Sequence, residues 1–122
     1  MLRGDVWLIN LDPTVGAEIK KTRPAVIVND DAIGILPLKI IVPITDWKDH
    51  YTIALWMVRL EPNANNGLGK ISAADAFQVR SISQERFIRR LGKLSDNEMR
   101  EITKALAVVL SINCTNHGDS YE

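Results

Sequence analysis

Cysteine and histidine are scarce in this chain of 122 residues, which holds one cysteine and two histidines. A single cysteine, Cys114, excludes an intramolecular disulfide framework and is typical of a protein of the reducing cytosol. Cys114 and His117 lie close together, but two ligands do not complete a zinc site, and His50 is remote in the sequence. Glycine-rich phosphate loops of the Walker or dinucleotide type are also absent. We therefore expect neither a metal nor another cofactor.

Long hydrophobic runs and an excess of either charge are lacking as well. No stretch approaches the roughly 20 apolar residues of a membrane span, and Asp5, Asn10 and Asp12 interrupt any secretory signal. We therefore expect a cytoplasmic protein that does not bind membranes. Fifteen Lys and Arg balance fifteen Asp and Glu, whereas a protein that binds long nucleic acid mainly by charge is strongly basic. Any nucleic-acid site must then be local.

What remains is the composition of an ordinary globular domain. The 46% of hydrophobic and 25% of charged residues are typical of one, and the length suffices for a single modest core. We expect one domain over residues 1–113, followed by a polar tail over residues 114–122.

Short apolar runs separated by turn-forming residues predict a mainly β domain. Pro43 lies inside one of these runs and indicates an edge position or a bulge there. Six or so short strands are typical of a small β-barrel or a strongly curved sheet. The expected strands cover residues 6–11, 25–28, 38–44 and 52–60, one or two stretches within 71–82, and residues 87–91.

One helix is well signalled near the C-terminus. Ser95, with Glu98 three residues later, forms a capping box. Met99, Ile102, Leu106 and Val109 then recur on one face at helical spacing. These signals predict a helix from about residue 96 to about residue 111, whose apolar face must pack on the sheet or on a second subunit.

Two polar groups at the ends of expected strands suit a phosphate. Arg23 immediately precedes the strand over residues 25–28, and Thr45 follows the strand over residues 38–44. If these strands are neighbours, a guanidinium and a hydroxyl converge at the rim of the sheet as phosphate donors. Alternatively, Arg23 pairs with Glu18 or Asp46 and Thr45 caps a turn, and spacing alone favours this alternative.

Four segments of the chain match one known family in order and spacing, over most of residues 3 to 110. They are RGDVWLINLDPTVGAEIKKTRPAVIVNDD at 3–31, IIVPIT at 40–45, NGLGKISAADAFQVRSISQERF at 66–87 and LGKLSDNEM at 91–99. With these segments the chain resembles the MazF/PemK family of toxin endoribonucleases from bacterial toxin–antitoxin systems. The resemblance implies an SH3-like barrel with a terminal helix, a homodimer, and a cognate antitoxin. It also implies metal-independent cleavage of single-stranded RNA (mRNA) at short sequences, which inhibits translation.

The resemblance also implies roles for particular residues. In the family reaction a ribose 2′-OH attacks its own 3′ phosphate and leaves a 2′,3′-cyclic phosphate and a 5′-OH end. Arg23 in KTRPAV and Thr45 in VPIT match the catalytic arginine and threonine, and Glu18 matches the acidic residue of the family's G-x-E loop. Glu18 is a candidate base, with a salt bridge to Lys20 or Arg23 as the alternative. The candidate RNA-binding residues are Lys20, Lys21, Gln78, Arg80, Trp47 and Tyr51.

One position departs from the family pattern. Phe77 stands directly before Gln78, where many members have an aspartate, and this bears on sequence specificity more than on the chemistry. Two further functions stay open, namely a non-catalytic toxin of the same fold that inhibits DNA gyrase, and an SH3-like binding module. Contact with DNA is expected only through a toxin–antitoxin complex.

Overall fold

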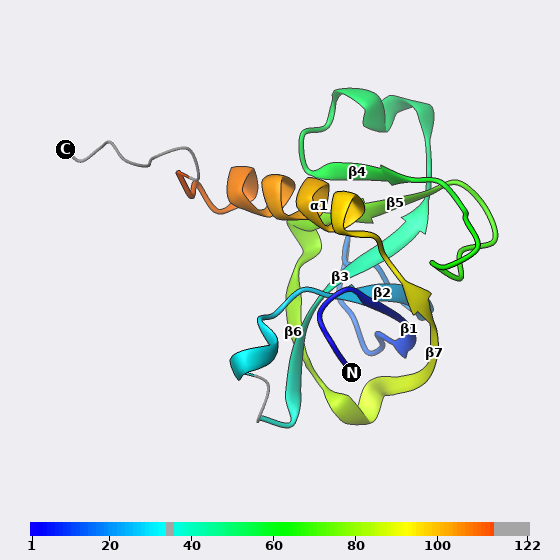
Figure 1. Cartoon of the computed structure of the whole chain (residues 1–122), viewed down its shortest axis with the longest axis vertical. Coiled ribbons are helices and arrows are strands. Elements are labelled where there is room, and N and C mark those ends of the chain that lie inside the picture. The colour runs from blue at the N-terminus through cyan, green and yellow to red at the C-terminus, as the bar shows by residue number, and fades with distance from the viewer. Residues whose placement is uncertain (34–35, 114–122) are drawn as a thin grey trace.

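The computed structural model describes residues 1–33 and 36–113, so the expected tail lies outside the described residues. Because of that, the domain boundary stays a prediction. The strands are β1 (Asp5–Asn10), β2 (Thr22–Ile27), β3 (Leu38–Asp46), β4 (Met57–Leu60), β5 (Ser72–Asp75), β6 (Arg80–Ser83) and β7 (Phe87–Lys93). The helices are α1 (Asp96–Val109) and the short 3₁₀ helices η1 (Asp31–Ile33), η2 (Asp49–Ile53), η3 (Ala76–Gln78) and η4 (Gln84–Arg86) (Figure 1).

β3 joins the two parts of an antiparallel sheet. One edge of β3 pairs with β2 over residues 41–43, while its other edge pairs first with β6 and then with β5. β2 continues to β1 and β7, and β5 continues to β4. Figure 1 shows β3 running from the part that holds β1, β2 and β6 to the part that holds β4 and β5.

The larger part of the sheet is curled. Its order is β6-β3-β2-β1-β7, and η4 alone connects the two outer strands. Four strand spacings would separate those strands by about 19 Å if the sheet were flat, whereas the connection spans at most about 14 Å. The sheet must therefore bend into an incompletely closed barrel, in agreement with the expected small barrel.

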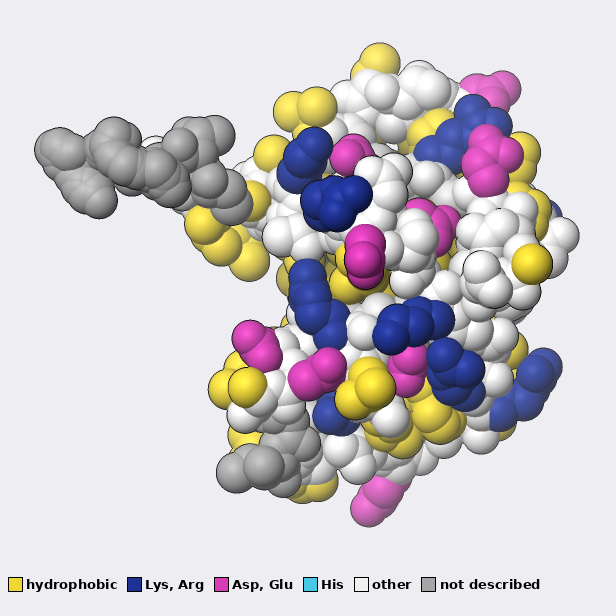
Figure 2. All heavy atoms as spheres, viewed as in Figure 1, with side chains coloured by type: hydrophobic (Ala, Val, Ile, Leu, Met, Phe, Trp, Pro, Cys, Tyr) yellow, Lys and Arg dark blue, Asp and Glu magenta, His cyan; other side chains and the backbone are white. Residues whose placement is uncertain are grey.

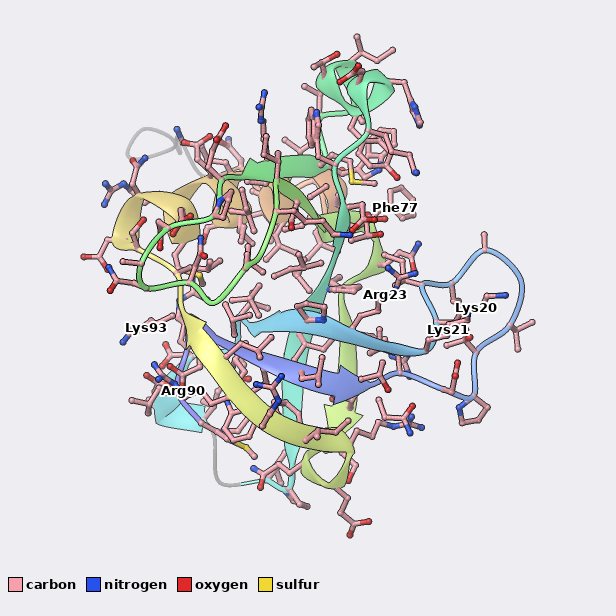
Figure 3. The ribbon with its side chains drawn as sticks, turned by 90° about the vertical axis from the view of Figure 1, so that its right-hand side faces the viewer. Lys20, Lys21, Arg23, Phe77, Arg90 and Lys93 are labelled. Carbon is pink, nitrogen blue, oxygen red and sulfur yellow. The ribbon has the colours of Figure 1, made fainter. Side chains whose placement is uncertain are left out.

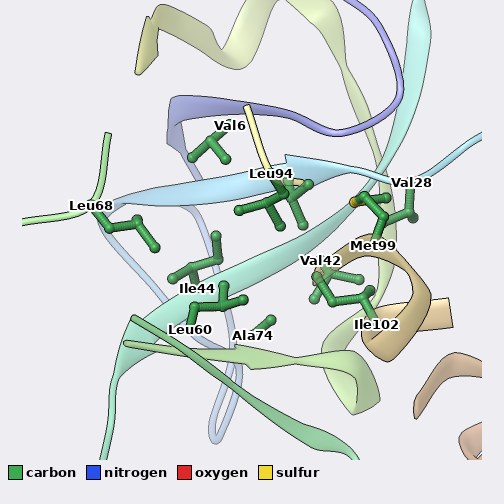
Figure 4. Packing of buried hydrophobic residues seen from close by; sticks show 11 residues of the cluster. Val6, Val28, Val42, Ile44, Leu60, Leu68, Ala74, Leu94, Met99 and Ile102 are labelled. Carbon is green, nitrogen blue, oxygen red and sulfur yellow. The ribbon is translucent and has the colours of Figure 1, made fainter. Parts of the chain in front are cut away.

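Two hydrophobic clusters lie on opposite faces of β2 and β3. Val26 and Val42 belong to the first cluster, which also includes Met99 and Ile102 of α1 (Figure 4). Their strand neighbours point the other way, and Ile27 joins the second cluster. Burial of both faces explains why these two strands read as nearly continuous apolar runs.

The predicted helix is confirmed, including the way it begins. The Ser95 hydroxyl accepts a hydrogen bond from the Glu98 N–H at 3.1 Å, and the Glu98 carboxylate accepts one from the Ser95 N–H at 2.8 Å. These two bonds complete the expected capping box. Met99 and Ile102 are buried against the sheet, so the sheet of the same chain covers this face.

Two strand predictions were wrong in detail. The strand expected over residues 52–60 begins only at Met57, because residues 49–53 form η2. Pro43 was expected at an edge or a bulge, yet β3 pairs along both of its edges. Pro43 falls in the gap between the segment paired with β6 and the segment paired with β5, where one edge of β3 has no ladder partner. A residue without an N–H is tolerated there.

Candidate active site

Arg23 and Thr45 line one pocket of about 240 Å³ at the ends of β2 and β3. The two strands pair with Ala25 opposite Pro43, and the same register, continued two residues, sets Arg23 opposite Thr45. Both residues are half-buried, so the pocket shields them without closing them off. The structure thus brings together the two residues that the sequence placed at the rim of the sheet.

The alternative ion pairs of Arg23 are not formed within the described part of the chain. The Asp46 carboxylate instead pairs with the Lys70 ammonium at 3.1 Å. The Arg23 Nε donates a hydrogen bond to the Lys20 carbonyl oxygen at 3.4 Å. This single long bond leaves most of the guanidinium donors open to a ligand.

A loop over residues 61–71 forms part of the wall of the pocket. Gly67, Leu68, Gly69 and Lys70 line the pocket, and Asn66 before them is fully buried. The Asn66 side chain accepts hydrogen bonds from backbone N–H groups on both sides of it and donates to the Glu61 carbonyl oxygen at 2.8 Å. The side-chain amide of Asn66 thus holds the backbone of this loop in its conformation.

Glu18, Gln78 and Arg80 line a neighbouring pocket of about 470 Å³, which we call the loop pocket. Glu18 is exposed, and its carboxylate accepts the Val15 N–H at 2.8 Å. It lines the loop pocket rather than the Arg23–Thr45 pocket, so its predicted role as a base stays a prediction. Neither Lys20 nor Arg23 forms an ion pair with it in the described chain.

Gln78 fastens the loop between β1 and β2 to η3. Its side-chain oxygen accepts the Ile19 N–H at 2.6 Å, and its side-chain nitrogen donates to the Ala17 carbonyl oxygen at 3.2 Å. Arg80 donates to the Leu11 carbonyl oxygen at 3.4 Å. These contacts give both residues a part in shaping the loop, and their contacts with RNA stay a prediction.

Lys20 and Lys21 lie in the same loop as Glu18 and are both exposed. Lys21 has a positive φ of 71°, and its N–H donates to the Asp12 carboxylate at 3.0 Å. Figure 3 shows Lys20 and Lys21 beyond Arg23 on the same side of the molecule. Their contacts with RNA stay a prediction.

The two aromatic residues predicted to stack on bases contact each other. Trp47 and Tyr51 meet edge to face with ring centroids 5.7 Å apart, and the Arg59 guanidinium lies 5.6 Å from the Trp47 ring centre. Both rings are half-buried. Phe77 is the more open aromatic, with 65% of its surface exposed, and it lines the loop pocket. Exposure thus favours Phe77 as a platform for a base.

The Asp75 carboxyl has a pKa that departs clearly from its ordinary value. Burial raises the pKa of the Asp75 carboxyl above its ordinary value of 3.8. The hydrogen bonds donated by the Phe77 N–H and by Gln78 lower this pKa, but their effect is smaller than that of burial. Asp75 is the N-cap of η3, and its side chain accepts a hydrogen bond from the Phe77 N–H. This bond helps to fix the backbone that carries the exposed Phe77 ring.

A third concavity, of about 500 Å³, lies between β7, the start of α1 and residues 63–65. Arg90 there pairs with Asp5 at 3.4 Å. Figure 3 shows Arg90 and Lys93 on the side away from Arg23, and Figure 2 shows acidic and basic side chains intermingled over one face. Its larger size does not make this concavity the better candidate, because Arg90 is already paired with Asp5 and the Glu98 carboxylate lines the concavity together with Lys93.

No three His, Cys, Asp or Glu side chains in residues 1–33 and 36–113 gather so that they could hold a metal ion. Cys114 and His117 lie outside the described residues. Within those residues, no helix has the length and apolar character needed to cross a membrane.

The sequence interpretation missed Lys70 and Asn66. Both lie in a segment rich in Asn and Gly, which predicts a turn and gives no indication of what the turn contacts. Lys70 reaches the pocket because Asp46 of β3 pairs in register with Ser72 of β5, two residues beyond it. That register is a property of the folded sheet.

The described residues form a curled antiparallel sheet with one covering helix, and this fold sets a guanidinium and a hydroxyl at the ends of adjacent strands. These features define a small barrel-like domain able to hold an anionic group. The model of the family described as PemK-like, MazF-like toxin of type II toxin–antitoxin system matches residues 2–110. The chain belongs to this family.

Individual relatives agree with this assignment. The chain is 31% identical over 118 residues to the endoribonuclease MazF9 of Mycobacterium tuberculosis, covering 92% of this chain and 98% of the relative. Its fold is similar to the crystal structure of MazF from Deinococcus radiodurans, with a TM-score of 0.76, 23% identity and coverage of 91% and 96%. It is also similar to an endoribonuclease in complex with its cognate antitoxin from a mycobacterial species, with a TM-score of 0.74, 19% identity and coverage of 93% and 97%.

Proposed function

We propose that this toxin is an endoribonuclease that cleaves single-stranded RNA by metal-independent transesterification. The observation that supports the proposal most is the shared pocket of Arg23 and Thr45. Family membership and the naming of a relative as an endoribonuclease support it further. Neutralisation by a cognate antitoxin and assembly as a homodimer belong to the same proposal. Since mRNA is the substrate, we place the protein in the cytoplasm.

The substrate supplies its own nucleophile. The 2′ oxygen forms a bond to phosphorus while the bond to the 5′ oxygen breaks, which leaves a 2′,3′-cyclic phosphate and a 5′-OH. Negative charge builds on the phosphoryl oxygens during this step. The Arg23 guanidinium and the Thr45 hydroxyl, held by two paired strands, are donors suited to that charge, and one such donor contributes about 3–4 kcal/mol.

Incubation of the purified protein with a long single-stranded RNA in the presence of EDTA tests this proposal. Fragments that end in cyclic phosphate are the expected product. Intact RNA together with stalled gyrase would support a gyrase-inhibiting toxin instead, and intact RNA with active gyrase would support a binding module. Sequencing the new ends identifies the cleavage site.

Arg23→Ala is expected to lower the cleavage rate by at least about 100-fold. The fold should stay intact, because Arg23 makes only one long hydrogen bond to the Lys20 carbonyl oxygen. Arg100→Ala, on the exposed face of α1, is the matched control and should cleave at the rate of the unaltered protein. Full activity of Arg23→Ala would refute the assigned role.

A further inference from the structure

The pocket of Arg23 and Thr45 holds a second cation, Lys70. We propose that Lys70 is a third catalytic residue, whose ammonium contacts the phosphoryl oxygens in the transition state after leaving its resting partner Asp46. This inference rests on the proposed ribonuclease function, and it adds a residue that the sequence motifs do not assign.

The resting position of the ammonium is well defined. The Lys70 Nζ lies 3.1 Å from the Asp46 Oδ1 and 3.2 Å from the Asp46 Oδ2, so both carboxylate oxygens hold it. Asp46 directly follows Thr45 on β3, and Ser72, two residues after Lys70, is its partner on β5. The ammonium is therefore held at Asp46, and Lys70, Asp46 and Thr45 all line the same pocket.

This ion pair is open enough to be exchanged for a substrate contact. The Lys70 side chain is 70% exposed and the Asp46 side chain 51% exposed, and ion pairs exposed to this extent contribute little to stability. A lysine carries three donors on a flexible stem of four carbons. The ammonium can therefore move from the carboxylate to a phosphate at small cost.

The chemistry requires more positive charge as the reaction proceeds. The phosphodiester begins with one negative charge and gains another when the deprotonated 2′ oxygen bonds to phosphorus. Arg23 supplies one cation, and Thr45 supplies a neutral donor. Lys70 supplies the second cation, and it keeps its own proton while the 2′-OH loses one and the 5′ oxygen gains one.

A matched exposed lysine exists elsewhere in the chain. Lys104 pairs with Glu101 on α1 at 3.3 Å, with side-chain exposures of 74% and 52%. This pair resembles the pair of Lys70 and Asp46 in distance and exposure but does not line the pocket. Lys104→Ala therefore controls for the loss of an exposed ion pair and of one positive charge.

The experiment measures cleavage and binding separately. The cleavage site is first mapped on a transcript, and an RNA oligonucleotide that contains it is then cleaved under single-turnover, saturating conditions. Binding is measured with the same oligonucleotide carrying a 2′-deoxy sugar at the cleaved nucleotide. Lys70→Ala, Lys70→Arg and Lys104→Ala are compared with the unaltered protein, and thermal melting checks the fold of each.

Lys70→Ala should slow cleavage about 10- to 100-fold, with the affinity for the 2′-deoxy oligonucleotide changed less than about threefold. Lys70→Arg should restore most of the rate, because it keeps the charge, and Lys104→Ala should cleave normally. Cleavage by Lys70→Ala within about twofold of the unaltered protein, or a loss confined to binding, would overturn the inference and leave the ribonuclease intact. No cleavage by the unaltered protein would overturn both.

Discussion

Asn66 offers a sharp test of how the pocket wall is held. Its side chain is fully buried, accepts the N–H groups of Leu68 at 3.0 Å and Asn63 at 3.3 Å, and donates to the Glu61 carbonyl oxygen at 2.8 Å. Asn66→Ala removes these three bonds, together with a longer one of 3.5 Å to the Glu98 carboxylate, and leaves the three backbone groups without a partner. At about 1 kcal/mol for each of the three backbone bonds, the free energy of unfolding should fall by about 3 kcal/mol.

For a domain of this length, such a loss lowers the melting temperature by about 12 °C. Differential scanning calorimetry measures the shift directly, and urea unfolding gives the free energy. Asn65→Ala is the matched control, because Asn65 lies in the same loop with its side chain exposed. This control should shift the melting temperature by less than about 2 °C.

A shift of less than about 4 °C for Asn66→Ala would refute the argument. It would mean that water or a relaxed loop replaces the three hydrogen bonds at little cost. Equal shifts for the two variants would also refute it, because they would show that the loop tolerates the loss of either asparagine side chain. The comparison therefore tests the buried amide itself and not the general stability of the loop.

Two further predictions concern the buried carboxyl of Asp75 and the close contact between Gly92 and the backbone of Asn65. Because burial raises the pKa of Asp75, the folded state binds more protons than the unfolded state between pH 3.8 and the raised value, so stability falls as pH rises through that window. Asp75→Asn should remove this dependence in urea unfolding followed from about pH 4 to about pH 7. Gly92→Ala places a Cβ against the Asn65 carbonyl oxygen and should lower the unfolding free energy by about 3 kcal/mol or more in the same assay. Gly69→Ala, where the space is open, should change it little, and equal effects of the two alanines would refute the steric argument.

Much of the fold could be predicted because its signals are local. The helix depends on Ser95, Glu98 and an apolar stripe within one short stretch, and all of these took the predicted form. The start of β4 could not be predicted in the same way. Residues 52–56 are as apolar as a strand, but residues 49–53 form a 3₁₀ helix. Residues 54–56 then link that helix to β4.

The candidate site was predictable where strand ends meet and unpredictable where loops meet. Arg23 and Thr45 come together because β2 and β3 are adjacent and antiparallel, which the sequence allowed as one of two alternatives. The place of Lys70 depends on the pairing of β3 with β5, between segments more than twenty residues apart. The contact between Trp47 and Tyr51 likewise depends on how η2 folds back.

The loop between β1 and β2 is held mainly through its own backbone. Gln78 binds the Ile19 N–H and the Ala17 carbonyl oxygen, and Arg80 and Arg86 donate to carbonyl oxygens of residues 10–12. Every residue type offers the same carbonyl, and all but proline offer the same N–H. Apart from Asp12 and Glu18, whose carboxylates accept N–H groups of the loop itself, side chains of this loop can therefore change during evolution without displacing the loop. The positions of Arg23 and Thr45 are then kept while the surface that the loop presents beside them varies.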